Sequence, residues 1–479
     1  MLEPAPHIGR WGTGALTSGI LALEYMSAST RAEELRAVGD LWGHPKGLAI
    51  LFFTEMWERF SYYGMRALLV LFLTSKHSGG LGWSSAEALQ FYGWYTMLVY
   101  VMGIPGGIIA DRILGQRKAI AYGGGLLCLG HGVMAVPAIW GFYCGVVLIV
   151  LGVGLLKPNI STMVGALYSE GDPRRDRGFT VFYMGINLGS LLSSIIVGYV
   201  GETYGWHYGF GLAGIGMVAG QILFMYGRRY FADVGARPTH VSPTGQAKPA
   251  SLTSVERDRI KVLGLSFAIV VVFWGAFEQA GGLLNLYTRD YIDRSVFGWE
   301  IPTSLFQALN AGFILLLGVP VAMYWARRRA SGKAATALFK MAIGTAIMGS
   351  GFLMMSAAAV EVELDASGNV VAKAAVIWLV AAYALHTIGE LCASPVALSF
   401  ITKLAPARFG SLMMGTYFAV TGVGNKVAGL LGESASEFGE LVVFTGIAIF
   451  CIVFGLLIVA LRGPLERMTH GAEDRDLER

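Results

Sequence analysis

Long apolar runs are the feature of this chain that most constrains its fold. Twelve runs in the 479 residues reach the length of about 20 residues that a helix needs to cross a bilayer. Only 14% of the residues are charged, whereas soluble globular domains carry about 25%. We therefore predict an all-α membrane protein with 12 transmembrane helices. The predicted spans are 47–74, 88–110, 117–138, 142–165, 180–200, 208–227, 262–288, 305–327, 335–358, 374–402, 410–431 and 440–461.

Positive charge alternates between the two sets of loops that join these runs. One set is rich in basic residues, and the other holds only Lys76, Arg289, Arg294 and Lys373. Because loops rich in Lys and Arg stay in the cytoplasm, the first set and both termini are predicted to be cytoplasmic. The basic residues of that set are Arg112, Arg117, Lys118, Arg174, Arg175, Arg177, Arg327, Arg328, Arg329, Lys333, Lys403 and Arg408.

A basic stretch with several prolines, residues 228–261, divides the runs into two sets of six, and we predict that it is a cytoplasmic linker. We predict an N-terminal tail (1–46), a six-helix bundle (47–227), the linker (228–261), a second six-helix bundle (262–462) and a C-terminal tail (463–479). Two such bundles with a cavity between them are the architecture of major facilitator transporters. Nothing before Met26 reads as structural, so Met26 is an alternative translation start.

The segment 106–118, between the second and third runs, resembles the cytoplasmic signature of the major facilitator superfamily. We expect its glycines to allow a tight turn and Asp111 to cap the helix that follows. Arg112 and Arg117 are expected to pair with helix ends. The alternative is that these charges only set the topology.

Six polar residues share one face of the first run: Glu55, Glu58, Arg59, Tyr62, Tyr63 and Arg66. At about 100° per residue, they fall between roughly −60° and +80° around the helix from Glu55. Ionisable groups within a span cost on the order of 3 kcal/mol each, so they mark transport pathways by default. The alternative is an ion-pair cluster that only holds helices together.

Further polar groups lie near the middle of other runs. Arg59 and Lys157 in the first half can attract a carboxylate, while Glu278 and Glu390 in the second half can attract an ammonium group or carry a proton. A cavity of this kind fits a zwitterion. Asn187, Gln307, Asn310 and Asn425 could equally hold helices together, and His386 could be structural or relay protons. Cys128, Cys144, Cys392 and Cys451 show no disulfide or metal spacing.

The residues of the first run match a known family motif. Glu55-Met56-Trp57-Glu58-Arg59-Phe60-Ser61-Tyr62-Tyr63-Gly64 matches the ExxERFxYYG motif of the proton-dependent oligopeptide transporter (POT) family. Segments 154–159, 185–189, 273–279 and 389–395 also resemble that family, in its order along the chain. The resemblance implies a proton-coupled symporter that imports di- and tripeptides by alternating access. It further implies a multi-pass protein of the bacterial inner membrane, with protons as the coupling ion and no other cofactor.

The resemblance also implies roles for single residues. In such transporters the residues matching Arg59 and Lys157 hold the peptide carboxylate, and those matching Asn187, Asn310 and Glu390 hold its ammonium group. Residues matching Tyr62, Tyr63, Tyr100, Trp274 and Ser394 line the cavity. The acids matching Glu55, Glu58 and Glu278 take part in proton coupling, and Glu278 can pair with Arg66. We expect the protein to act as a monomer and to bind no nucleic acid.

Two departures from the family pattern bear on mechanism. The linker is too short for the two extra helices of many bacterial members, and Gly93 stands where animal members have a histidine. Proton coupling is therefore expected to depend on carboxylates. A divergent member that carries nitrate or another small metabolite is the alternative function, although Glu390 disfavours a purely anionic substrate. A membrane enzyme or sensor is disfavoured, because no nucleophile elbow, metal cluster or phosphate loop is present.

Overall fold

The computed structural model describes residues 39–76, 79–169, 172–236, 252–333, 335–406 and 409–472. The expectations for most of the N-terminal tail, the middle of the linker, Met26 and Arg408 lie outside the described residues.

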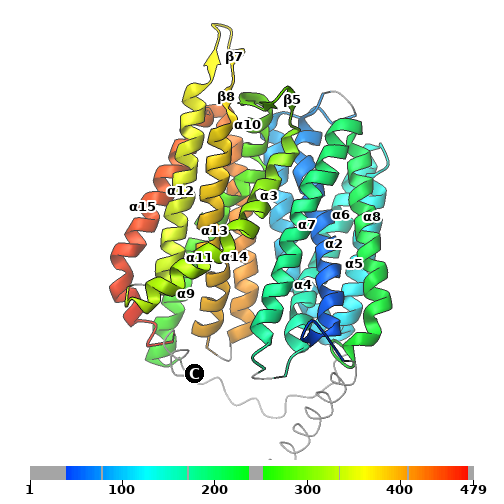
Figure 1. Ribbon diagram of the computed structural model, residues 1–479, viewed down its shortest axis with the longest axis vertical. Helices are drawn as coiled ribbons and strands as arrows, with labels where there is room; N and C mark the ends of the chain where they lie inside the picture. Colours follow the sequence, from blue (N-terminus) through cyan, green and yellow to red (C-terminus); the bar gives the residue numbers. More distant parts are fainter. Residues whose placement is uncertain are drawn as a thin grey trace, which may run out of the picture.

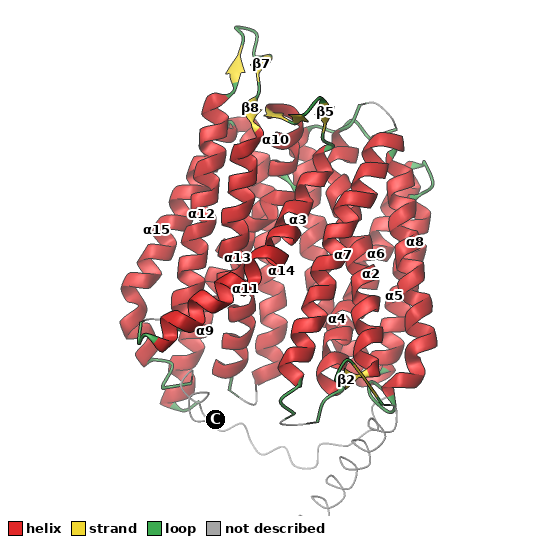
Figure 2. Cartoon of the chain, in the orientation of Figure 1, coloured by secondary structure: helices red, strands yellow, loops and turns green. Residues whose placement is uncertain are grey.

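The described chain is built almost entirely of long helices (Figures 1 and 2). The first group is α2 (Lys46–Thr74), α3 (Ser85–Val101), α4 (Gly103–Ile109), the π-helix η1 (Ala110–Leu114), α5 (Gln116–Met134), α6 (Ile139–Ala166), α7 (Arg175–Tyr204), α8 (Trp206–Gly227) and η2 (Arg228–Phe231). The second group is α9 (Ser254–Phe277), η3 (Glu278–Gly281), α10 (Leu283–Tyr291), η4 (Thr303–Gln307), α11 (Ala308–Ala330), α12 (Ala337–Glu361), α13 (Val376–Leu404), α14 (Gly410–Phe438) and α15 (Glu440–Arg467).

Strands occur only as short pairs in the loops of the described chain. Strand β1 (Asp40–Leu41) pairs antiparallel with β2 (His44–Pro45), and β4 (Ser295–Val296) pairs antiparallel with β5 (Trp299–Glu300). Strand β6 (Glu363–Leu364) pairs antiparallel with β7 (Val370–Ala372), whereas β3 (Ile292–Asp293) pairs parallel with β8 (Ala374–Ala375). They contribute little to the core.

Nine helical segments of the described chain are long and apolar enough to cross a membrane. They are Ser85–Leu114, Ile139–Ala166, Arg175–Tyr204, Trp206–Phe231, Ser254–Tyr291, Thr303–Ala330, Ala337–Glu361, Val376–Ile401 and Glu440–Arg467. Helices α2, α5 and α14 overlap three more of the predicted spans but are not among these nine, and α2 carries five charged residues. The count of twelve spans therefore stays a prediction.

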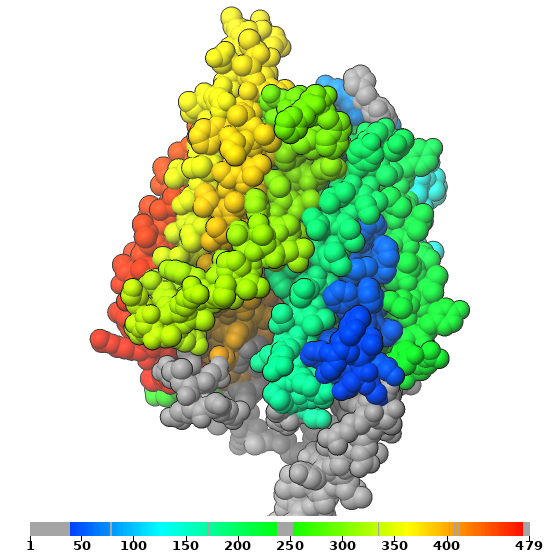
Figure 3. Space-filling view, viewed as in Figure 1, coloured from blue at the N-terminus to red at the C-terminus, as the bar shows by residue number. Residues whose placement is uncertain are grey.

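The helices gather into two groups that lie side by side (Figure 1). In the first group α2 packs against α7 and α8, and α5 packs against α6; in the second, α12 packs against α13 and α15. The groups meet where α3 packs on α14 and α7 on α11. Figure 3 shows the N-terminal part of α2 at the surface between α7 and α8. The rest of α2 is buried, which places its polar residues inside the protein.

Local capping explains where two of the helices begin. At the start of α3, the side chain of Ser84 accepts a hydrogen bond from the Glu87 backbone N–H, and the Glu87 carboxylate accepts one from the Ser84 backbone N–H. Thr253 and Glu256 form the same capping box at the start of α9. Because of this box, α9 begins at Ser254, within the range that we expected to be linker.

The signature segment folds differently from our expectation. Gly106 and Gly107 lie in helix α4, and the turn falls at Gly115, whose φ of 75° favours glycine. Gly115 is also the N-cap of α5, so the cap predicted for Asp111 is wrong, and Asp111 accepts a hydrogen bond from the Gln116 side chain instead.

The two arginines of this segment differ in their contacts. Arg117 donates to the carbonyl groups of Phe231, Ala232 and Val234, beyond the end of α8, which confirms its predicted pairing with a helix end. Arg112 is exposed.

Gly106 and Gly107 provide a matched test of helix packing. A Cβ at Gly106 would lie 2.0 Å from the Gly154 carbonyl oxygen of α6, whereas a Cβ at Gly107 would meet nothing within 4 Å. Gly106→Ala should therefore destabilise the fold by about 1–3 kcal/mol through overpacking. Gly107→Ala should be neutral or stabilising by about 0.5–1 kcal/mol. Thermal unfolding of the detergent-solubilised variants measures both, and equal melting temperatures would contradict the close α4–α6 contact.

Candidate functional site

A central cavity of about 180 Å³ lies between the two groups of helices. Ten of the fourteen predicted site residues line it: Glu55, Arg59, Tyr63, Arg66, Lys157, Asn187, Trp274, Asn310, Glu390 and Ser394. The other four touch that lining from behind: Glu58 against Arg59, Tyr62 against Tyr63, Tyr100 against Lys157 and Glu278 against Arg66. The predicted residues thus come together at one place.

The guanidinium group of Arg59 lies between two carboxylates of its own helix. Its Nε is 3.2 Å from Glu55 Oε1, and its Nη2 donates to Glu58 Oε1 at 2.6 Å. A second contact joins Nε to Glu58 Oε2. All three side chains are almost fully buried, so the charges compensate one another in a place that water hardly reaches.

Aromatic rings surround the cationic side of the cavity. The Arg59 guanidinium lies 5.1 Å from the centre of the Tyr62 ring and 5.9 Å from that of Tyr63. Across on α6, the Lys157 ammonium lies 3.8 Å from the centre of the Tyr100 ring. The faces of these rings carry partial negative charge and stabilise a cation beside them. Arg59 and Lys157 therefore give the wall formed by the first group of helices a positive character.

The second group of helices contributes an acid to the same cavity. Glu390 on α13 accepts a hydrogen bond of 2.8 Å from the Asn310 amide of α11, and the same amide lies 3.2 Å from Thr387 Oγ1. Asn310 thereby orients the carboxylate. No cation is paired with Glu390 among the described ion pairs, in contrast to Glu55 and Glu58. The cavity is thus positive on one wall and acidic on the other.

A second buried ion pair joins the two groups of helices. Arg66 Nη2 lies 3.0 Å from Glu278 Oε2, and the Tyr92 hydroxyl donates to the same oxygen at 2.7 Å. Arg66 Nε in turn donates to that hydroxyl at 2.8 Å. The pairing of Arg66 with Glu278, which the family resemblance implied, is present, and Tyr92 is a third member that we did not predict.

A helix break makes room for this triad. The predicted span 262–288 is not one helix, because α9 passes into the 3₁₀ turn η3 and then into α10 beyond Gly282. A Cβ at Gly281 would lie 2.2 Å from the Tyr92 hydroxyl and 2.7 Å from Arg66 Nε. Glycine is therefore required where the chain passes these two side chains.

The six polar residues that share one face of α2 do not all line the cavity. Glu55, Arg59, Tyr63 and Arg66 line it, but Glu58 and Tyr62 are buried beside it. Helix α2 is enclosed on its flanks by neighbouring helices. Glu58 and Tyr62, which fall at negative angles from Glu55 around the helix, therefore pack against neighbouring parts of the protein.

Ten lining residues were absent from the predicted site. Tyr183, Ser190 and Ser194 precede and follow Asn187 on α7 by four, three and seven residues, so helical periodicity could have found them. Tyr383 and His386 likewise precede Glu390 by seven and four residues on α13. His386 packs against Phe352, with ring centres 4.6 Å apart and the rings tilted by 36°, which favours a structural role for this histidine. The other additions are Ser161, Ile186, Phe277, Ala280 and Gln307.

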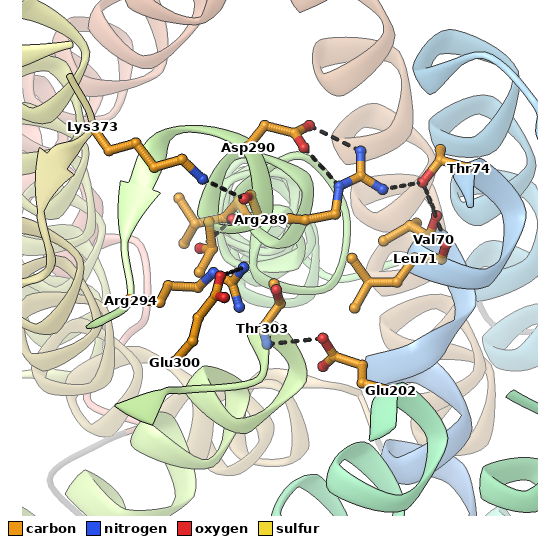
Figure 4. Close-up of polar contacts among 12 residues, drawn as sticks. Val70, Leu71, Thr74, Glu202, Arg289, Asp290, Arg294, Glu300, Thr303 and Lys373 are labelled. Atoms are coloured by element: carbon orange, nitrogen blue, oxygen red, sulfur yellow. Dashed lines mark hydrogen bonds and ion pairs between the residues drawn. The ribbon is translucent and has the colours of Figure 1, made fainter. Parts of the chain in front are cut away.

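Polar contacts join the two groups of helices at one end of the molecule (Figure 4). This is the end where α2 stops at Thr74, which the charge pattern predicts to be extracellular, and we call it the outer end. Arg289 of α10 donates to Thr74 Oγ1 at 2.6 Å, and the Asn285 amide donates to the Ala67 carbonyl oxygen at 2.9 Å. These bonds tie α10 to α2.

A carboxylate makes a further link at the outer end. Glu202 of α7 accepts hydrogen bonds from the backbone N–H groups of Thr303 at 3.0 Å and Ser304 at 2.6 Å, at the start of η4. Free N–H groups at the start of a helical turn favour a negative charge. Glu202 therefore joins the two groups of helices through the backbone of η4.

Comparison with known proteins identifies the family. A model described as the POT family matches residues 117–255 and 254–443. The peptide transporter YePEPT of Yersinia enterocolitica is 35% identical, over 90% of this chain and 96% of its own. The chain belongs to the POT family. Its POT relatives include a di-/tripeptide transporter of Lactococcus lactis subsp. cremoris, which is 33% identical over 89% of this chain and 97% of its own.

The fold agrees with solved POT structures. A crystal structure of a mutant of the peptide transporter POT in complex with alafosfalin superposes with a TM-score of 0.84, at 33% identity, over 92% of this chain and 99% of its own. As a POT member, the chain is a multi-span membrane transport protein and not an enzyme. Among the described residues no group of three His, Cys, Asp or Glu side chains is placed to hold a metal ion.

The Arg66–Glu278 pair leads to a prediction about the outer end. Glu278→Gln leaves the buried Arg66 charge without its partner, at a cost of about 3–5 kcal/mol, unless the outer end opens and admits water. A cysteine placed at Ser194 in a cysteine-free background should then react faster with an impermeant maleimide added outside. Tyr92→Phe, which removes one hydroxyl but keeps the ion pair, is the control and should have a smaller effect. Unchanged labelling in Glu278→Gln would show that the pair does not hold the outer end closed.

Proposed function

We propose that this protein is a proton-coupled symporter that imports di- and tripeptides by alternating access. The observation that carries the proposal is the polarity of the cavity, with Arg59 and Lys157 on one wall and Glu390 on the other. A peptide carries a carboxylate at one end and an ammonium group at the other, so it complements both walls. The names of the relatives, a peptide transporter and a di-/tripeptide transporter, support the same substrate class.

The two ends of the peptide are bound by different residues. Arg59 and Lys157 of the first group bind the carboxylate, whereas Asn310 and Glu390 of the second group, together with Asn187 of α7, bind the ammonium group. The Glu390 carboxylate has no cation paired with it among the described ion pairs. It therefore disfavours nitrate or another anion as the substrate, since an anion has no positive group that could pair with this carboxylate. Tyr62, Tyr63, Tyr100, Trp274 and Ser394 shape the space for the peptide backbone and side chains.

Proton coupling is assigned to the acids that now hold the cations. While Glu55 and Glu58 are ionised, both contact the Arg59 guanidinium, and a substrate carboxylate must compete with them. A proton taken up by Glu58 removes one competitor and leaves Arg59 an attractive partner for the peptide. Glu278 acts in the same way on Arg66, so its protonation loosens the link between the two groups of helices. No other cofactor is needed.

Alternating access requires that the outer and inner ends open in turn. The nine apolar segments together with α2, α5 and α14 would supply the twelve spans, arranged as bundles at 47–227 and 262–462 with both termini in the cytoplasm. The links at Arg66, Asn285, Arg289 and Glu202 would break when the bundles rock to open the outer end. We place the protein, as a monomer, in the bacterial inner membrane.

Uptake into proteoliposomes tests this proposal. Labelled dialanine should accumulate under an inward proton gradient, a protonophore should abolish the accumulation, and nitrate should not compete. Glu58→Gln should lose gradient-driven uptake but retain counterflow, because exchange of bound peptide needs no net proton movement. Gradient-driven uptake at the normal rate in Glu58→Gln would remove its assigned role, and failure of dialanine to bind would remove the substrate assignment.

Glu202 provides a test of the outer closure. Hydrogen bonds to a charged group contribute about 1.5–3 kcal/mol each, so Glu202→Gln should raise the outward-open population about tenfold or more. Spin labels at the exposed positions Tyr204 and Trp299 report the opening as a longer distance. Glu300→Gln is the matched control, since Glu300 pairs with Arg294 of the same loop and joins no other helix group. An identical distance distribution in Glu202→Gln and the control would contradict the link.

A further inference from the structure

One buried amide in the central cavity differs from the others. The described chain buries six Asn and Gln side chains: Asn159, Asn187, Gln279, Asn285, Gln307 and Asn425. Five of them donate a hydrogen bond from the side-chain nitrogen to a backbone carbonyl oxygen, at distances from 2.7 to 3.4 Å. The side-chain nitrogen of Gln307 has no hydrogen-bond partner among the described residues. A buried polar group without a partner is rare and requires an explanation.

Gln307 lies at the boundary between the two groups of helices. It is the last residue of η4 and lines the central cavity, with 8% of its surface exposed. Glu202 of α7 holds the start of η4 through the backbone N–H groups of Thr303 and Ser304 (Figure 4). The turn that carries Gln307 is therefore held in place, whereas the nitrogen of its amide makes no bond within the described protein.

The nearest cavity residue along the chain is Asn310, which follows Gln307 by three positions. The Cβ atoms of residues three apart on a helix lie about 5–6 Å from each other. The Asn310 amide already donates to Glu390, at 2.8 Å. Gln307 thus presents a second amide beside the carboxylate to which we assign the ammonium group of the peptide.

The contacts distinguish between the two roles that the sequence left open for Gln307. A residue that holds helices together donates to an acceptor on a neighbouring helix, as Asn425 of α14 does to the Thr96 carbonyl oxygen of α3. Gln307 makes no such bond with its side-chain nitrogen. The last torsion of a glutamine is broad, so the amide can turn at little cost until its nitrogen meets an acceptor in the cavity. We therefore look for that acceptor on the substrate.

The chemistry of a peptide identifies the acceptor. In a peptide whose ammonium group is bound at Glu390, a single carbon atom separates the amino nitrogen from the first carbonyl group. This carbonyl oxygen is present in every di- and tripeptide and loses its hydrogen bonds to water when the peptide enters the cavity. A donor beside Glu390 is needed to replace them, and Gln307 is placed to supply it.

We propose that Gln307 is a specificity-determining residue, which donates a hydrogen bond from its side-chain nitrogen to the first carbonyl oxygen of the bound peptide. This role rests on the proposed function, because it uses the orientation of the peptide in the cavity. Two opposite charges at the right separation are then not enough for tight binding. The ligand must also carry a carbonyl group one carbon atom away from its ammonium group, which separates peptides from amino acids with a plain carbon chain of the same length.

Three zwitterions with the same number of atoms between their charged groups test this role. Glycylglycine has a peptide group in the middle, 5-aminolevulinate keeps the carbonyl group but has a methylene group in place of the N–H, and 5-aminopentanoate has neither. The affinity of the purified full-length protein for each is measured by isothermal titration calorimetry. The wild type should bind glycylglycine and 5-aminolevulinate about tenfold more tightly than 5-aminopentanoate, since one hydrogen bond contributes about that factor.

Gln307→Met removes the donor and keeps an unbranched side chain of similar length. The variant should bind glycylglycine and 5-aminolevulinate about tenfold more weakly than the wild type, and 5-aminopentanoate equally well. Gln90→Met is the matched control, because Gln90 is an exposed glutamine of α3 that does not line the cavity. The control should bind all three ligands as the wild type does.

Failure of this role can be told apart from failure of the proposed function. If the wild type binds none of the three zwitterions, the proposed function is wrong and the role of Gln307 with it. If the wild type prefers the two carbonyl ligands and Gln307→Met keeps that preference, only the role of Gln307 is wrong. An equal loss for all three ligands in Gln307→Met would indicate a distorted cavity and also contradict the role. A loss for glycylglycine alone would assign Gln307 to the peptide N–H and overturn the assignment to the carbonyl oxygen.

Discussion

The pairing of charges inside α2 is the interaction on which the rest of the structure depends. Glu55, Glu58, Arg59 and Arg66 are each 5% exposed or less, and an unpaired charge at such a place would be costly. Arg59 is satisfied by the two glutamates of its own helix, whereas Arg66 finds its partner, Glu278, across the boundary between the two helix groups. The pairing of Arg59 within α2 allows this helix to lie at the centre of the fold, and the pairing of Arg66 with Glu278 joins the two groups of helices.

The ion pairs of Arg59 and of Arg66 differ in what a change of charge would affect. A proton on Glu55 or Glu58, or a carboxylate bound at Arg59, changes charges within one helix and need not move the helix groups. A change at Arg66 and Glu278 acts on the contact between the groups, and Tyr92 shares in it through its hydroxyl. The glycine at 281 lets the chain pass close to both side chains, because a Cβ there would lie 2.2 Å from the Tyr92 hydroxyl and 2.7 Å from Arg66 Nε. Glu278 and this close passage therefore belong to the same short segment, η3.

Cations occupy two different environments in this molecule. In the central cavity, Arg59 and Lys157 lie beside aromatic rings, and Arg59 is also paired with acids. Outside this cavity, Arg328, Lys340 and Arg462 lie over the rings of Phe339 and Trp325, beside an apolar pocket lined by α11, α12 and α13. Helix α13 separates the two environments, with Glu390 on one face and Cys392 on the other.

Much of the fold follows from the sequence alone. The apolar runs determined a helical membrane protein, because a backbone in lipid must satisfy its hydrogen bonds within each segment. The motif of the first run identified the family, and ten of the fourteen residues assigned to the site line one cavity. Ends of elements were less predictable, since the capping box at Thr253 starts α9 eight residues before the predicted span, and Gly115 takes the place of Asp111 as the cap of α5.

The tertiary structure decided which side of each helix matters. Periodicity gives the angle between residues on one helix, but the rotation of that helix toward a cavity is set by neighbours far away in the sequence. For this reason Glu58 and Tyr62 lie behind the lining, and Tyr92 and Glu202 have partners that no local pattern could indicate. The sequence by itself determined that buried charges exist in this protein and had to be paired. Only the packing of distant helices decided with which partners, because that pairing depends on distances between segments that the chain order does not contain.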